Sequence, residues 1–382
     1  MNVRTSFDED RMSDAMWSRL EDVRPRLKVR LGRLDMQANF LHRIILRWLV
    51  GLIGSWIIVY LVGPWIVNSI LVRTHEPSLD TIMLRPGDAI RWRSEGFGTT
   101  HVGDFGLPGW QPLQTAGRIV LWGDSQVEGF CVDDADKIAN QCVRLMDNQT
   151  DFLPIARSGT DAFDWSQRIT AADSLWHPQF HVWIVTELSD LVAISNNAKQ
   201  SGVGTWSNES SWMVRGASAV RGDALFQAMR NVLLDPSTGG LRSLRWSIGP
   251  RGDQSSSEAS VSPDENTLTM TAADVIALNQ ILDGRLLVVY APGVPRIDRG
   301  VVTDHPDDEA WETLSAMLRD EVAIVDMRPA LIERSATEKR FPRGFDNGTP
   351  SYGHLNEFGN RIIAQSIVNW LRSREREAGG SR

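Results

Sequence analysis

A long uncharged segment near the N-terminus limits the possible folds more than any other feature of the chain. Residues 48–72 read WLVGLIGSWIIVYLVGPWIVNSILV and contain no Asp, Glu, Lys or Arg. As a helix, this segment is long enough to cross a hydrocarbon core of about 30 Å. Proline is tolerated in membrane helices, so Pro64 does not exclude a span, and Asn68 lies close to the end, near the interface. The sequence therefore predicts a transmembrane helix over 48–72, and a buried helical hairpin of a soluble protein is the alternative.

The flanking charges predict how this helix is oriented. The segment begins too late and runs too long for the apolar part of a cleavable signal, and no A-x-A-like site follows it, so we expect a permanent anchor. Cations outnumber acids in the residues just before it (Lys28, Arg30, Arg33, Arg43 and Arg47 against Asp35), although arginines also follow it. This bias favours a cytoplasmic tail over 1–47, a single pass through the inner membrane, and an extracytoplasmic, periplasmic C-terminal part.

Charge and cysteine content exclude several other classes. The net charge of −8 and the pI near 5.5 give no basic surface, so we expect no nucleic-acid partner. Cys131 and Cys142 are the two cysteines, which excludes a Cys-rich zinc site and leaves open either one disulfide or two buried thiols. Asp304 and His305 have no further ligand at useful spacing. We expect no metal and no cofactor.

Beyond the anchor, apolar runs alternate with helix-period segments, which is typical of βαβ units and a doubly wound, mostly parallel sheet. The predicted strands are 118–122, 151–156, 181–186, 285–290 and 322–326, and the predicted helices lie near 136–146, 163–175, 271–282, 307–318 and 357–372. The expected fold class is therefore α/β, with helices flanking the sheet and one N-terminal transmembrane helix.

The domain boundaries follow from the same alternation of predicted strands and helices. We expect a linker and lead-in over 73–116, the α/β domain over 117–375, and a disordered tail over 376–382. A segment rich in Gly, Ser and Trp over 196–265 interrupts the rhythm and is predicted to be an insertion with a helix near 223–234. Its tryptophans (Trp206, Trp212 and Trp246) either line a carbohydrate-binding cleft or are packing residues.

Two residues are candidates for chemistry. The predicted strand RIVLW runs directly into Gly123-Asp124-Ser125, which places a hydroxyl at the carboxyl end of a strand, where α/β folds build their sites. His354 lies in a polar loop before the last helix, where it can reach over the strand ends. A serine becomes nucleophilic only when a base removes its proton and dipoles stabilise the oxyanion, so we pair Ser125 with His354.

In these blocks the chain resembles the SGNH, or GDSL, hydrolases, and in particular their membrane-anchored bacterial members. The first family block, GDS after a strand, matches Gly123-Asp124-Ser125, and the last, D-x-x-H-x-N-x-x-G, matches His354, Asn356 and Gly359. The segment 102–109 is similar to the lead-in of many bacterial members. The resemblance covers residues 86–371 and implies an SGNH-like fold with a serine esterase or acyltransferase activity.

The resemblance also assigns the oxyanion hole. The second block falls on Arg157-Ser158-Gly159-Thr160-Asp161 and implies the backbone N–H of Gly159 as a donor, with Ala162 as the alternative register. In the third block, G-x-N-D, the final position is Asp190, while Ser189 replaces the usual asparagine. Loss of such a donor costs on the order of 10²–10³ in rate, so we expect Ser189 to weaken this contact without removing it.

A second departure concerns the acid of the triad. The family aspartate would lie at Ser351, so either a Ser–His dyad suffices or another carboxylate, with Asp346 the candidate acid, orients the imidazole. Asp346 beside Asn347-Gly348 also fits a plain turn.

The resemblance implies acyl, and in particular acetyl, esters of cell-envelope glycans as substrates, with hydrolysis and transfer both open. Because two supporting residues depart from the family pattern, the alternative is a non-catalytic SGNH-like domain that binds glycan or supports an envelope assembly. The sequence predicts no particular protein partner.

Overall fold

The computed structural model describes residues 40–58, 60–62, 68–69, 71–113, 117–195, 263–298, 301–348 and 350–379. The chain divides into two compact units, which meet in sequence between Val62 and Gly63. The predicted tail before residue 40 lies outside the described residues. Most of the predicted 196–265 insertion, with its helix and its three tryptophans, lies outside them as well.

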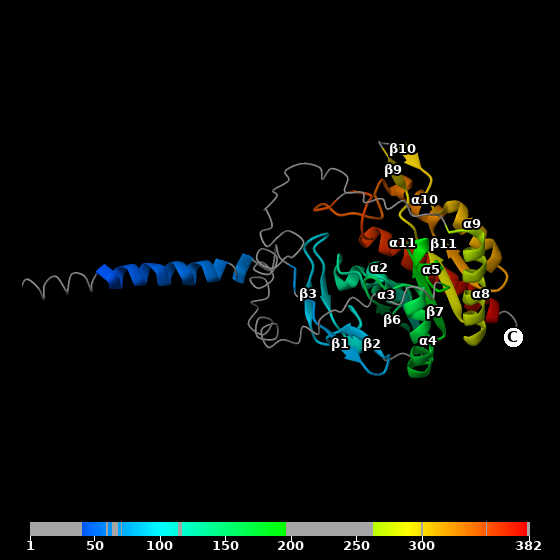
Figure 1. Ribbon diagram of the computed structural model, residues 1–382, viewed down its shortest axis with the longest axis horizontal. Helices are drawn as coiled ribbons and strands as arrows, with labels where there is room; N and C mark the ends of the chain where they lie inside the picture. The colour runs from blue at the N-terminus through cyan, green and yellow to red at the C-terminus, as the bar shows by residue number, and fades with distance from the viewer. Residues whose placement is uncertain are drawn as a thin grey trace, which may run out of the picture. The chain divides into compact units, whose positions relative to one another are not determined.

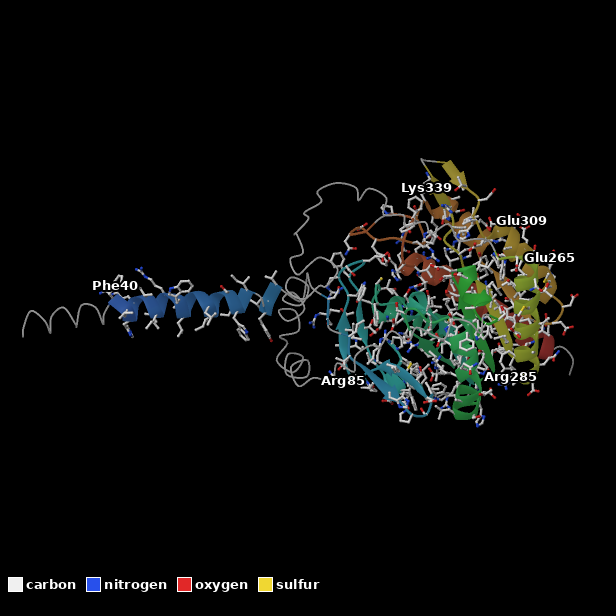
Figure 2. The ribbon with its side chains drawn as sticks, viewed as in Figure 1. Phe40, Arg85, Glu265, Arg285, Glu309 and Lys339 are labelled. Atoms are coloured by element: carbon white, nitrogen blue, oxygen red, sulfur yellow. The ribbon has the colours of Figure 1, made fainter. Side chains whose placement is uncertain are left out.

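Among the described residues, one helix, Phe40–Val62, is long and apolar enough to cross a membrane, with a mean hydropathy of 2.0. Its large apolar side chains are exposed along its length (Figure 2). The described part of this helix overlaps the predicted span of 48–72 over residues 48–62. The end of that span is part of the second unit, because Asn68 Oδ1 accepts hydrogen bonds from the backbone N–H groups of Arg93 and Ser94.

The second unit contains a five-stranded parallel sheet in the order β11-β8-β7-β5-β6 (Figure 1). Its strands are β5 (Gly117–Gly123), β6 (Thr150–Ala156), β7 (Phe180–Val185), β8 (Leu286–Tyr290) and β11 (Ala323–Asp326). Each coincides with a predicted strand to within a residue or two, which confirms the fold class. In the pairing register, Gly123 lies beside Ala156 and Val185 beside Tyr290. The carboxyl ends of these strands therefore lie at one edge of the sheet.

Helices cover both faces of this sheet, as a doubly wound fold requires. They are α2 (Ser125–Glu128), α3 (Ile138–Leu145), α4 (Ala162–Trp176), α5 (Leu188–Val192), α8 (Glu265–Ile281), α9 (Asp308–Leu318), α10 (Arg328–Glu338) and α11 (Glu357–Gly379). Alternate residues of each strand point to opposite faces, so Val120 and Trp122 pack with α4, α5, α8 and α9. Ile119 and Leu121 pack on the other face with α2, α3, α10 and α11.

The boundaries differ from the sequence predictions at both ends of this domain. The predicted linker over 73–116 contains two antiparallel strand pairs, β1 (Arg73–Glu76) with β2 (Thr81–Leu84) and β3 (Ala89–Arg91) with β4 (Thr99–His101). Leu84, Ile90, Val102 and Phe130 form a small core beneath them. At the other end, α11 continues to Gly379, into the predicted tail. A third antiparallel pair is β9 (Arg296–Asp298) with β10 (Val301–Thr303).

Candidate active site

Ser125 is the first residue of α2, at a tight turn that follows β5. The turn requires a glycine before it, because a Cβ on Gly123 would lie 2.2 Å from the Val127 side chain. Asp124 caps the helix, with its Oδ1 accepting a hydrogen bond from the Gln126 N–H at 2.8 Å, which stabilises the turn. The turn thus presents the Ser125 hydroxyl beyond the carboxyl end of β5.

His354 lies in the loop that precedes α11, and Asn356 fixes the shape of this loop. The Asn356 side chain accepts hydrogen bonds from the first N–H groups of α11 and donates to the carbonyls of Phe341 and Gly344. The loop is also joined to the nucleophile turn, because Gln126 Oε1 accepts a hydrogen bond from the Leu355 N–H at 2.8 Å. These contacts explain physically why the last family block contains an asparagine two residues after the histidine.

The structure brings the two predicted catalytic residues together. His354 Nε2 and Ser125 Oγ are 3.1 Å apart, within hydrogen-bond reach. On the other side of the ring, Nδ1 lies 2.6 Å from Glu95 Oε2, and the His354 backbone N–H donates to Glu95 Oε1 at 2.8 Å. With Nδ1 protonated and donating to the carboxylate, Nε2 is left to accept the hydroxyl proton of Ser125.

Glu95 is a carboxylate beside His354 that the sequence did not single out. It lies in the loop between β3 and β4, inside the stretch predicted to be a linker. Asn347 holds this loop in place: its Oδ1 accepts from the Gly96 N–H at 2.7 Å, and its Nδ2 donates to the Gly96 carbonyl at 3.0 Å. Gly353, at φ +89°, leaves room for the carboxylate, because a Cβ there would lie 2.2 Å from Glu95 Oε1.

Glu95 is a third possibility for the acid, beside the Ser–His dyad and Asp346 that the sequence left open. Asp346 is exposed, and Ser351 lies in a left-handed turn (φ 64°) where its N–H donates to the Arg343 carbonyl. The support for Asp346 remains its proximity along the chain to His354. The available signal was an acid flanked by glycines, Ser-Glu-Gly-Phe-Gly over 94–98, which predicts a turn able to present a carboxylate.

The surroundings of the imidazole favour its protonated form. Burial lowers the pKa of His354, but the nearby Cys131 sulfur and the Glu95 carboxylate outweigh burial and raise this pKa to about 10. For Glu95, burial acts in the opposite direction and raises the pKa. The two hydrogen bonds from His354 outweigh burial, so the pKa of Glu95 is lowered overall. Glu95 is thus ionised at neutral pH, as the orienting acid must be.

Cys131 gives the site a third group with metal-ligating chemistry. Ligand atoms of Glu95, Cys131 and His354 all lie within 4.8 Å of one another, and in the part of the chain that the structure describes they are the one such cluster found. Both ring nitrogens of His354 are already engaged, with Glu95 and with Ser125. A metal ion bound here would have to break the 2.6 Å contact, so the arrangement fits acid–base chemistry better than a metal centre.

Neither cysteine forms a disulfide. Cys131 and Cys142 are both buried free thiols. Burial raises the pKa of Cys142, which lies in α3 with its sulfur 3.8 Å from the Ala364 carbonyl of α11. Of the two possibilities that the sequence left open, the structure has the pair of buried thiols.

The two predicted oxyanion-hole residues follow the strands on either side of β5. Gly159 lies after β6 in a left-handed conformation (φ +77°), and a Cβ there would meet nothing within 4 Å. Its N–H donates to no group among the described residues. Ser189 lies in α5, after β7, and is exposed. Ser125, Gly159 and Ser189 thus occupy one edge of the sheet, while Ala162 is buried at the start of α4.

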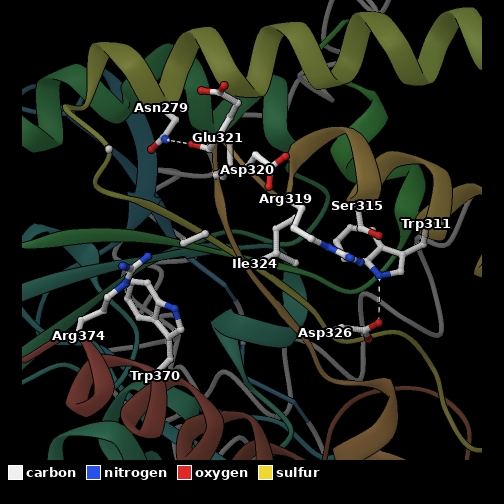
Figure 3. A pocket seen from close by; sticks show the side chains of 13 residues that line it. Asn279, Trp311, Ser315, Arg319, Asp320, Glu321, Ile324, Asp326, Trp370 and Arg374 are labelled. Carbon is white, nitrogen blue, oxygen red and sulfur yellow. Dashed lines mark hydrogen bonds between the residues drawn. The ribbon is translucent and has the colours of Figure 1, made fainter. Parts of the chain in front are cut away.

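A cavity of about 490 Å³ lies elsewhere, along the edge strand β11. Trp311 and Trp370 are among its lining residues, and Arg374 and Asp326 also reach it (Figure 3). None of the catalytic candidates lines this cavity, so we do not assign the chemistry to it.

Comparison with known proteins places the chain beside several solved structures, although no family model and no curated protein sequence matches it. A lipase/acylhydrolase from Enterococcus faecalis has 12% identity and a TM-score of 0.36, covering 68% of this chain and 96% of its own. A catalytic mutant of an acetylxylan esterase from Geobacillus stearothermophilus has 10% identity and a TM-score of 0.35, covering 68% and 95%. A lipolytic protein of the G-D-S-L family from Desulfitobacterium hafniense has 10% identity and a TM-score of 0.32, covering 66% and 98%. One of these three structures is thus described as a member of the G-D-S-L family, and the other two as an acylhydrolase and an esterase.

Proposed function

We propose that this chain is a membrane-anchored serine esterase or O-acyltransferase that acts on acyl esters outside the cytoplasm. The observation that supports this most is the continuous Ser125–His354–Glu95 array, with contacts of 3.1 and 2.6 Å. A serine, a base and an orienting carboxylate in this order form the triad that activates a hydroxyl for acyl transfer.

In the proposed reaction, Ser125 Oγ attacks the ester carbonyl while its proton passes to His354 Nε2. The N–H groups of Ser125 and Gly159 and the Ser189 hydroxyl would stabilise the resulting oxyanion. When the tetrahedral intermediate collapses, the bond to the leaving alcohol breaks and His354 returns the proton to that alcohol. Water or an acceptor hydroxyl then attacks the acyl-Ser125 ester by the same steps, which gives hydrolysis or transfer.

The substrate and the location belong to the proposal as well. A helix such as Phe40–Val62 would anchor the domain in the cytoplasmic membrane, and the cations that precede it favour a periplasmic domain. A tethered domain there meets the glycans of the envelope first. We therefore propose O-acetyl esters of envelope polysaccharides as the substrate class, in keeping with the family that the sequence blocks resemble.

The test is turnover and labelling of the full-length chain in detergent micelles. We expect hydrolysis of p-nitrophenyl acetate and covalent labelling of Ser125 by a fluorophosphonate, with Ser125→Ala abolishing both and His354→Ala reducing both by orders of magnitude. Release of acetate from acetylated polysaccharide, compared with release of fatty acid from long-chain esters, tests the substrate class. Absence of both turnover and labelling would instead favour the non-catalytic, glycan-binding alternative.

A further inference from the structure

Glu128 is a buried carboxylate three residues after the nucleophile. It lies at the end of α2, and its side chain is 0% exposed. Its two oxygens have different partners: Arg73 donates to Oε1 at 2.6 Å, and the backbone N–H of Ser158 donates to Oε2 at 3.0 Å. The Lys137 ammonium donates to the backbone carbonyl of Glu128 at 2.9 Å, which holds this end of α2 in place.

The Ser158 N–H belongs to the turn that presents Gly159. The Thr160 N–H donates to the Arg157 carbonyl at 3.2 Å, which closes a four-residue turn over 157–160. Gly159, with φ +77°, occupies the third position, where a type II turn needs a positive φ. The Thr160 hydroxyl and the Arg157 N–H both reach the carbonyl of Gly123, two residues before the nucleophile. The orientation of the Gly159 N–H therefore depends on how this turn is held against the nucleophile turn.

An ion pair alone does not explain why a carboxylate occupies this position. Removing two charges from water costs several kcal/mol per ion, and apolar residues of similar volume often replace a buried pair without loss of stability. What apolar residues cannot supply is an acceptor for the Ser158 N–H. Because Arg73 engages only Oε1, the second oxygen remains free for the turn.

We propose that Glu128 is a positioning residue that fixes the oxyanion donor Gly159 through the Ser158 N–H, and that Arg73 of β1 holds its carboxylate in place. The inference rests on the proposed function, because it assigns Gly159 to an oxyanion. It makes β1, in the predicted linker, part of the machinery for acyl transfer.

Two double variants separate this role from a purely structural one. Arg73→Met with Glu128→Gln removes both charges but keeps an amide oxygen that can accept from Ser158. Arg73→Met with Glu128→Met removes the charges and the acceptor at similar volume. Both variants avoid an unpaired buried charge, so we expect both to fold. Circular dichroism and thermal unfolding of the full-length chain in micelles would check this.

We expect the Gln variant to lose less kcat for p-nitrophenyl acetate than the Met variant, because its amide oxygen can still accept from the Ser158 N–H although Arg73 no longer holds it. The Met variant should lose about 10- to 100-fold in kcat with little change in KM, because the donor acts on the transition state. Backbone hydrogen–deuterium exchange at Ser158 should be faster in the Met variant than in the Gln variant. Exchange requires no turnover, so it tests the hydrogen bond between the Ser158 N–H and Glu128 even if the wild type proves inactive.

Equal exchange at Ser158 in the two variants would show that residue 128 does not hold the Ser158 N–H, which overturns the inference. If exchange at Ser158 is faster in the Met variant but kcat is equal in the two variants, residue 128 holds the Ser158 N–H without positioning an oxyanion donor. That result overturns the inference and leaves the proposed esterase activity intact. A third outcome is that the wild type is inactive and unlabelled while exchange at Ser158 still differs between the two variants. That outcome would refute the proposed function and, with it, the catalytic part of the inference.

Discussion

Glu95 and His354 lie 259 positions apart in the chain, yet they share two hydrogen bonds, one from the ring Nδ1 at 2.6 Å and one from the backbone N–H at 2.8 Å. The ring bond selects the tautomer, and the backbone bond fixes the loop to the same carboxylate. Glu95 therefore sets both the protonation pattern of the base and its position over Ser125.

Replacement of Glu95 by glutamine should reduce kcat by about 10²–10⁴, because an amide can no longer stabilise the imidazolium and can impose the wrong tautomer. Asp346→Asn is the matched control, since this exposed carboxylate in the His354 loop should not affect turnover. Steady-state kinetics on p-nitrophenyl acetate measures both. A large loss in the Asp346 variant with none in the Glu95 variant would reverse the assignment of the acid.

The rate of ester hydrolysis should rise into the alkaline range. A base acts only when it is unprotonated, and the pKa of His354 is raised to about 10, so the active fraction grows as pH increases towards that value. Cys131→Ala removes one of the causes of this raised pKa and should shift the rising limb of kcat/KM to lower pH. A limb that keeps its position in the Cys131 variant would show that the sulfur does not influence the imidazole. Cys142→Ala, at a thiol in α3, is the control.

Gly353→Ala should impair catalysis strongly. The new Cβ would lie 2.2 Å from Glu95 Oε1, and φ at this position is +89°, so both the carboxylate and the backbone would have to move. We expect kcat to fall by at least tenfold, with a lower melting temperature. Gly348→Ala, where a Cβ would make ordinary contacts at 3.6 Å, is the control in the same loop. Similar effects of the two substitutions would argue against a specific clash with Glu95.

Asn356→Ala should destabilise the domain and reduce activity together. Its side chain makes four hydrogen bonds that cap α11 and close the His354 loop. Loss of a helix cap typically costs about 1 kcal/mol, and the buried carbonyls left without a donor add to this. Urea denaturation measures the stability. Asn369→Ala, at an exposed position of the same helix, should be neutral or slightly stabilising, because Ala has the higher helix propensity. An equal loss there would show that the effect of Asn356→Ala is not specific to the cap.

Much of the fold could be predicted because it depends on local patterns. The strand RIVLW is buried along its length as β5, and its continuous apolar run is typical of a parallel strand covered on both faces. Ser125 and His354 could be located because each adjoins a recognisable element boundary, the end of a strand and the start of a helix.

Glu95 could not be located in this way. Its role depends on a tertiary contact between a hairpin loop near one end of the domain and a loop near the other, and no local pattern encodes that contact. The β3–β4 pair was missed because three-residue strands are too short to show an alternating pattern. The contacts of Asn68 were missed for a similar reason, since they join it to a distant part of the chain and the apolar run alone does not reveal this.

The position of Glu95 between β3 and β4 determines how a soluble form of the domain would have to be cut. A fragment that begins at Gly117 would retain the complete parallel sheet, the nucleophile and the base, but it would lack the acid. It would also lose Arg73, the partner of Glu128. A fragment meant to retain the whole site must begin near Asn68, because Arg73 and Glu95 both precede the domain's first parallel strand in the sequence.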